Sequence, residues 1–89
     1  MNTQNNRIVE YVAFETCNIN GVIIFFKDEE RTTYEDGTVR KEFKYSKREY
    51  RDNTSEQVNY KDEKSFRNAI KRIASDKNTT LIEHKYIKK

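Results

Sequence analysis

The pattern of hydrophobic and polar positions in residues 22–51 predicts a long β-hairpin around which the chain is organised. Residues 22–26 (VIIFF) form a continuous apolar run that is too short for a helix and typical of a central strand. The chain becomes polar after Lys27, but the β-formers at 32–34 (TTY) favour continuation of the strand. The second arm alternates basic and aromatic residues up to Arg51.

The Asp-Gly pair at residues 36–37 predicts the turn of this hairpin, because both residue types tolerate the positive φ of a tight two-residue loop. With such a loop, Arg31 faces Glu42 and Glu29 faces Lys44. Two cross-strand pairs of opposite charge then lie on one face, each contributing about 0.2–1 kcal/mol. Turn chemistry and pair chemistry therefore agree on this register.

Two further strand signals flank the hairpin. Residues 8–17 (IVEYVAFETC) are rich in β-branched and aromatic residues and predict the first strand. The Asn-Gly pair at the end of residues 18–21 predicts the turn into the hairpin. Residues 52–57 (DNTSEQ) are polar and read as a loop.

A helix is expected next, because apolar residues recur at helical spacing on one side, namely Phe66, Ala69, Ile70, Ile73 and Ala74. Asn59 or Asp62 is the expected N-cap, and residues 79–87 read as a last strand. Together these elements predict an α+β fold, with an antiparallel β-sheet of three to four strands in β-β-β-α-β order and one amphipathic helix packed on one face. We expect residues 1–6 to be a disordered N-terminus and residues 7–89 to form a single domain.

Composition adds that this domain has a thin core. Only 34% of the residues are hydrophobic and 37% are charged, with a net charge of +3. An 89-residue chain also buries a smaller share of its surface than a larger domain. Ordering on a ligand, or a homodimer, would supply the missing burial.

The sequence contains no apolar stretch of membrane-spanning length and no signal-peptide pattern at its start, so we expect a cytoplasmic protein without a membrane partner. The single cysteine excludes an intrachain disulfide.

The residue types present do not favour a catalytic or a cofactor-binding site. Cys17 and His84 are the only cysteine and histidine, and we interpret them as a small buried residue and a rim residue of the last strand rather than a dyad. They do not make a four-ligand zinc site. Gly21 and Gly37, the only glycines, are both used in turns, so no phosphate-binding loop is present. The acidic run at 28–36 is typical of a solvated hairpin arm. We expect a non-enzymatic protein with no cofactor and no metal.

One pattern indicates a binding surface. Cations and tyrosines are interleaved on the second hairpin arm, and further cations form a row on the polar side of the helix; cations suit phosphates and flat rings suit unstacked bases. Strand alternation should separate Lys44, Arg48 and Tyr50 from the other members of the arm. The candidate nucleic-acid-binding residues are Lys44, Tyr45, Lys47, Arg48, Tyr50, Arg51, Lys64, Arg67, Lys71 and Arg72.

Two functional hypotheses follow. The first is a small basic protein that binds RNA or single-stranded DNA with low sequence specificity through the hairpin arm and the helix row. The second is a protein-binding inhibitor or adaptor, of the kind a phage or other mobile element encodes, that acts on a host protein. The acidic hairpin arm favours the second, because it would repel phosphates.

Overall fold

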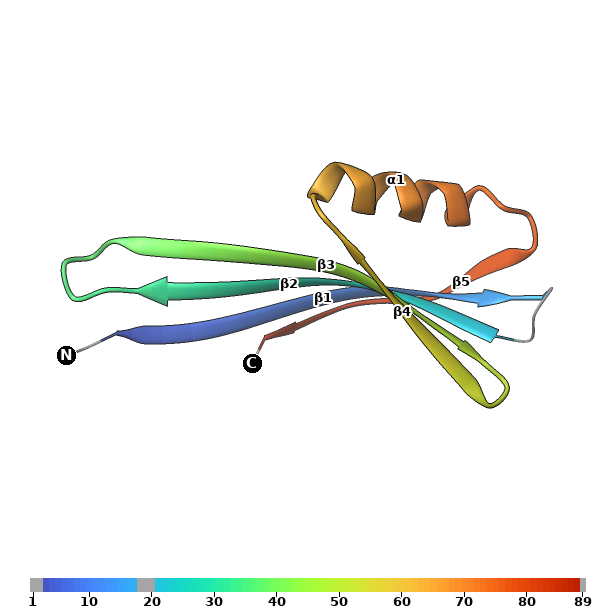
Figure 1. Cartoon of the computed structure of the whole chain (residues 1–89), viewed down its shortest axis with the longest axis horizontal. Helices are drawn as coiled ribbons and strands as arrows, with labels where there is room; N and C mark the ends of the chain where they lie inside the picture. The colour runs from blue at the N-terminus through green and yellow to red at the C-terminus, as the bar shows by residue number, and fades with distance from the viewer. Residues whose placement is uncertain (1–2, 18–20, 89) are drawn as a thin grey trace.

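The computed structural model describes residues 3–17 and 21–88, which form a five-stranded antiparallel sheet with one helix on one face (Figure 1). The strands are β1 (Gln4–Thr16), β2 (Gly21–Thr33), β3 (Val39–Arg51), β4 (Thr54–Tyr60) and β5 (Thr79–Lys88), and the helix α1 spans Glu63–Ala74. The order across the sheet is β4-β3-β2-β1-β5. The α+β class is confirmed. The predicted strand count and β-β-β-α-β order are wrong, because a fourth strand precedes the helix.

That additional strand, β4, lies largely within the segment predicted to be a loop. It pairs with β3 from Tyr45↔Tyr60 to Arg51↔Thr54 and forms one edge of the sheet. The connection turns at Asp52, whose φ of 38° lies in the left-handed region that Asp tolerates better than most residues. All of β4 except Tyr60 is exposed, so it carries no apolar run that would mark it as a strand.

The β2–β3 hairpin is present, but its register differs from the predicted one by one residue. The Gly37 N–H donates to the Tyr34 carbonyl (3.0 Å), and the Tyr34 N–H donates to the Thr38 carbonyl (2.9 Å). Gly37 has a φ of 90°. The connection is thus a three-residue loop, in which a tight turn is followed by a left-handed glycine, instead of a two-residue loop.

This shift changes which charges face one another. Arg31 pairs across the ladder with Lys41 instead of Glu42, and the predicted pairing of Glu29 with Lys44 is wrong for the same reason. Arg31 instead forms an ion pair with Glu29 on its own strand, at 2.7 Å between Nη2 and Oε2.

β1 lies between β2 and β5 in the sheet. It begins at Gln4, inside the segment expected to be disordered, and pairs with β2 as far as Thr16↔Gly21. The predicted turn at 18–21 falls mainly on residues 18–20, which lie outside the described residues. On its other side β1 pairs with β5, with a bulge between Ala13 and Phe14.

The helix α1 covers the hydrophobic core on one face of the sheet. Asp62 is the N-cap, and its Oδ1 accepts a hydrogen bond from the Ser65 N–H at 2.8 Å. Phe66 is buried among Phe14, Ile23, Phe25 and Tyr45, and most of the predicted apolar stripe packs against this cluster. Ala74, the last member of that stripe, is exposed.

The molecule is elongated, measuring 52 × 26 × 19 Å. The helix covers part of one side of the sheet, and the tip of the β2–β3 hairpin and the start of β1 extend beyond it (Figure 1). We call the side that α1 covers the helix face and the opposite side of the sheet the open face. Three candidate residues of the hairpin arm, Lys44, Arg48 and Tyr50, lie on the open face.

Candidate nucleic-acid interface

The cross-strand pairs divide the basic second arm between the two faces. Lys27, which is on the same face as the core residue Phe25, pairs with Tyr45. Residues of β3 with odd numbers therefore lie on the helix face and those with even numbers on the open face. Lys44, Arg48 and Tyr50 are consequently on the open face, separated from Tyr45, Lys47 and Arg51, as alternation predicts.

Tyr45 is part of the core. It is 9% exposed, and its ring centroid lies 5.1 Å from that of Phe66. Its hydroxyl lies 3.5 Å from Oε2 of Glu63. Burial, and then the Glu63 carboxylate, raise the pKa of the phenol. The ring leaves no face for a nucleic-acid base.

Lys47 and Arg51 have a local acidic partner. Glu49 lies between them on the helix face, with its carboxylate 3.7 Å from Nζ of Lys47 and 3.5 Å from Nη2 of Arg51. Glu49 reaches both cations because residues two apart on one strand share a face. Their charges are partly neutralised before any ligand binds.

The helix row lies on the other side of the molecule from the open face. Lys64, Lys71 and Arg72 are exposed, and Arg67 donates to Oε1 of Glu63 at 2.8 Å. This hydrogen bond lowers the pKa of Glu63. The row does not join Lys44 and Arg48 in one continuous basic surface, because the sheet separates them.

The open face carries a group of polar side chains that we call the polar strip. It follows three rows of the β3–β4 ladder, Ser46↔Asn59, Arg48↔Gln57 and Tyr50↔Ser55. Within the described side chains, Lys44 at one end of these rows and Arg48 form no ion pair. The polar strip consists of Lys44, Ser46, Arg48, Tyr50, Gln57 and Asn59.

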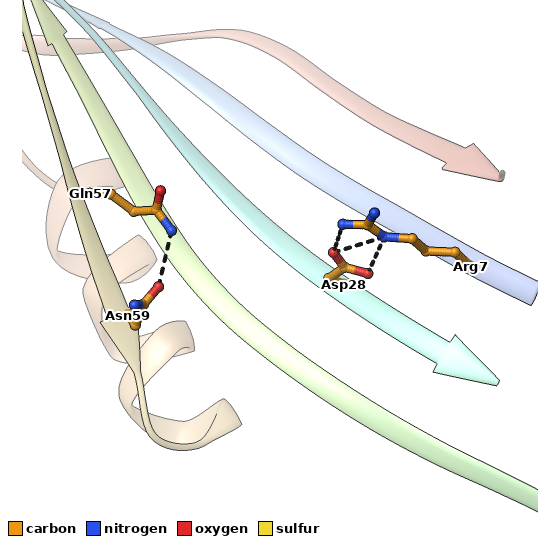
Figure 2. Close-up of polar contacts among 4 residues, drawn as sticks. All are labelled: Arg7, Asp28, Gln57 and Asn59. Carbon is orange, nitrogen blue, oxygen red and sulfur yellow. Dashed lines mark hydrogen bonds and ion pairs between the residues drawn. The ribbon is translucent and has the colours of Figure 1, made fainter. Parts of the chain in front are cut away.

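Hydrogen bonds to neutral acceptors organise this strip. Arg48 donates from Nη2 to Oε1 of Gln57 (2.8 Å) and from Nη1 to the Tyr50 hydroxyl (3.4 Å). Gln57 in turn donates from Nε2 to Oδ1 of Asn59 (3.1 Å; Figure 2). The Arg48 guanidinium thus has no carboxylate partner among the described side chains and is held beside two amides and a phenol ring that is 40% exposed.

Beside the strip, the open face is hollowed by a shallow depression of about 350 Å³. Phe26 and Val9 provide its apolar surface, and Arg7 and Asp28 border it. Nε of Arg7 donates to Oδ1 of Asp28 at 2.9 Å, and this hydrogen bond raises the pKa of Arg7 (Figure 2). Asp28 is therefore paired with Arg7. Lys44 forms no ion pair with a described side chain, although Glu30 and Glu42 line a smaller hollow together with it.

Sequence reasoning missed Gln57, Asn59 and Arg7. The two amides were assigned to a polar loop or a helix cap, and only recognition of β4 places them beside Arg48. The signal was present in Asp52 and Asn53, a pair that suits a tight turn between two strands. Arg7 carries no local signal, since its position depends on the β1–β2 register.

The structure brings together no cluster typical of catalysis or metal binding. Cys17 is exposed, so the prediction that it is buried is wrong. His84 pairs with Val12, five residues along β1 from Cys17, or about 16 Å at the usual strand rise. Among residues 3–17 and 21–88, no three His, Cys, Asp or Glu side chains are grouped to hold a metal ion. In the same residues, no helix has the length and apolar character needed to cross a bilayer.

Comparison with known proteins gives no relative: no family model, curated protein or solved structure matches the chain.

Proposed function

We propose that this protein binds single-stranded nucleic acid, RNA or DNA, on the open face of its sheet. The observation that carries the proposal is the polar strip, in which a guanidinium without an ion pair, an exposed phenol ring and two amides lie side by side on the sheet face that α1 does not cover. The proposed site thus retains Lys44, Arg48 and Tyr50 from the hairpin arm and adds Gln57 and Asn59.

Each group in the strip matches one requirement of a single-stranded ligand. Lys44 and Arg48 would contact phosphates, and Tyr50 offers a ring on which a base can stack. The amides of Gln57 and Asn59 both donate and accept, so they would contact base edges or sugar hydroxyls. An open sheet face accommodates a splayed single strand more readily than it enters a duplex groove.

The distribution of carboxylates on the open face limits the size of this site. Glu30 and Glu42 lie towards the hairpin tip, Asp28 lies opposite Lys44 and is paired with Arg7, and Glu15 and Glu83 lie on β1 and β5. None of the strip residues is itself acidic. With two or three phosphate contacts, the logarithm of the association constant should fall against the logarithm of salt concentration with a slope of about −1.4 to −2.

The test is fluorescence anisotropy with a labelled single-stranded oligonucleotide, repeated over a series of salt concentrations. Replacing Arg48 by Ala should weaken binding by about fivefold or more and make the salt slope shallower by about 0.7. The matched control is Lys71→Ala, which removes an exposed cation from the helix and should change affinity by less than about twofold.

A second pair of variants separates stacking from charge. Tyr50→Ala should weaken binding by about fivefold or more, because stacking on an aromatic ring contributes about 1–3 kcal/mol per base. Tyr86→Ala removes a tyrosine of similar exposure, 54% against 40%, from the helix face and should have no effect. Wild-type protein that does not bind at low salt, or equal losses in both members of a pair, would refute the proposal.

A protein partner is the second candidate function. The observation that favours it is an apolar depression of about 360 Å³ on the β1–β2–β5 side of the open face. An inhibitor or adaptor would use this surface, and its complex would survive nuclease treatment and high salt. A nucleic-acid complex would be lost under both conditions.

A further inference from the structure

The apolar part of the open face is a sheet surface that α1 does not cover. It is made by β1, β2 and the bulged part of β5, where Ile82 is inserted opposite the Ala13/Phe14 step. Of the described residues that line the depression, only Glu83 is charged. We call this surface the apolar patch; its main members are Val9, Tyr11, Val22, Ile24, Phe26 and Ile82.

Members of the patch contact one another. The rings of Tyr11 and Phe26 lie 6.2 Å apart in a tilted arrangement, and both side chains are partly buried. Burial, with the nearby Glu83 carboxylate, raises the pKa of Tyr11. Ile82, on the edge strand β5, is 48% exposed and is the most solvent-accessible isoleucine of the patch.

The monomer exposes more surface than its mass accounts for. A compact chain of 10.8 kDa should expose about 5,500 Å². This chain exposes 6765 Å², an excess of about 1,200 Å² over that expectation. Its radius of gyration is 15.7 Å, whereas about 12 Å is expected for 89 residues. A standard protein interface buries about 800 Å² on each partner, so the excess is large enough to supply one.

We propose that a second copy of this chain covers the apolar patch, so that the β1–β2–β5 parts of two open faces pack sheet against sheet in a symmetric dimer. Two aligned antiparallel sheets bury their apolar faces in this way at a separation of about 10 Å. The five-residue core under α1 would then be joined by a second apolar layer. This second layer would supply the burial that the composition lacks.

The charges of the open face permit two copies to approach. Although the whole chain carries a net charge of +3, cations and carboxylates of the described residues are equal in number on this face, so two such faces have no net repulsion. The cations are Arg7, Arg40, Lys44, Arg48 and Lys85, and the carboxylates are Glu15, Asp28, Glu30, Glu42 and Glu83.

The dimer leaves the proposed nucleic-acid site at the rim of the interface. The patch and the depression beside the polar strip share only Val9 and Phe26. Polar, solvent-accessible side chains are the usual border of an apolar interface core. Self-association therefore does not depend on nucleic-acid binding, and either proposal can fail alone.

Two neighbouring residues of β5 provide a matched test by sedimentation equilibrium or light scattering. Ile82→Lys places a charge in the patch, and Leu81→Lys places the same charge on the helix face, where Leu81 pairs with Phe14. The two residues are 48% and 56% exposed, so neither substitution should unfold the chain. Circular dichroism checks that both variants fold.

Wild-type protein, freed of nucleic acid by nuclease, should have twice the 10.8 kDa chain mass at about 100 µM, since interfaces of this size bind with dissociation constants of about micromolar or below. Ile82→Lys should raise the dimer dissociation constant by about tenfold or more, and Leu81→Lys should leave it unchanged. A wild-type monomer at this concentration would overturn the proposal. The same holds for a dimer that both substitutions affect equally, or one that nuclease abolishes.

A measurement on the unmodified chain makes the result independent of the variants. In a mixture of isotope-labelled and unlabelled protein, isotope-filtered nuclear Overhauser effects should connect Ile24 and Phe26 with residues of the patch in the other copy. Contacts between copies that involve the helix or the strand edges instead would place the interface elsewhere and reject the proposal.

Discussion

Replacing Phe66 by Ala tests whether α1 is held to the sheet by one aromatic anchor. Phe66 is the buried residue of the helix, 6% exposed, and its ring centroid lies 6.0 Å from Phe25, 5.1 Å from Tyr45 and 6.0 Å from Tyr60. Truncation of such a side chain costs about 3–5 kcal/mol. The whole domain should be stable by only about 4–13 kcal/mol, so the substitution removes a large share of that stability.

The free energy of unfolding can be measured by urea denaturation followed by circular dichroism. Phe43→Ala is the matched control, because Phe43 lies on the same face but is 42% exposed, with its ring stacked on Tyr45 at 6.3 Å and Nζ of Lys27 5.5 Å from its centroid. We expect the control to cost about 1 kcal/mol or less. Because a 12-residue helix is marginal on its own, Phe66→Ala should also reduce the helical signal before the main transition. Equal losses for the two variants would refute the anchoring role of Phe66.

Three further predictions concern the turn, the cap and the core tyrosine. Gly37→Ala should cost about 1–2 kcal/mol of unfolding free energy. The cost comes from backbone strain alone, since φ is 90° and a Cβ would meet no atom within 4 Å. Gly37→Asn should cost less, and urea denaturation compares the two variants. Hydrogen bonds from Ser65 lower the pKa of Asp62 below 3.8. The stability that Asp62 contributes is therefore full above pH 3.8 and is lost as the pH falls through the lowered pKa. In thermal melts at successive pH values, Asp62→Ala should lose less stability on acidification than wild type. Tyr45→Phe should change the unfolding free energy by less than about 1 kcal/mol, because the hydroxyl makes only a long contact to Glu63; a larger loss in denaturation would contradict the weakness of that bond.

The sequence predicts the long hairpin and the amphipathic helix because their signals are local. The apolar run at 22–26 and the spacing from Phe66 to Ile73 each follow from the period of one element. The hairpin register was not predictable with the same certainty. Asp36-Gly37 suits both a two-residue loop and a three-residue loop that ends in a left-handed glycine, and the choice moves every cross-strand pair by one residue.

The candidate site was predicted in part for a related reason. Alternation along β3 correctly separates Lys44 and Arg48 from Tyr45, but it does not say which face the helix covers. The burial of Tyr45 is decided by its contact with Phe66, far away in the sequence. Gln57 and Asn59 depend on β4, an exposed edge strand whose polar residues give no periodic apolar signal.

Nuclear magnetic resonance titration with a single-stranded oligonucleotide tests the proposed function most directly. Backbone amide shifts, followed in isotope-labelled wild-type protein, should change most for residues 44–50 of β3 and 57–59 of β4, saturate with added ligand, and diminish as salt is raised. Amides of α1 should remain unaffected, although Lys64, Lys71 and Arg72 are exposed there. Absence of any shift, or shifts confined to α1, would contradict the assignment of nucleic-acid binding to the open face.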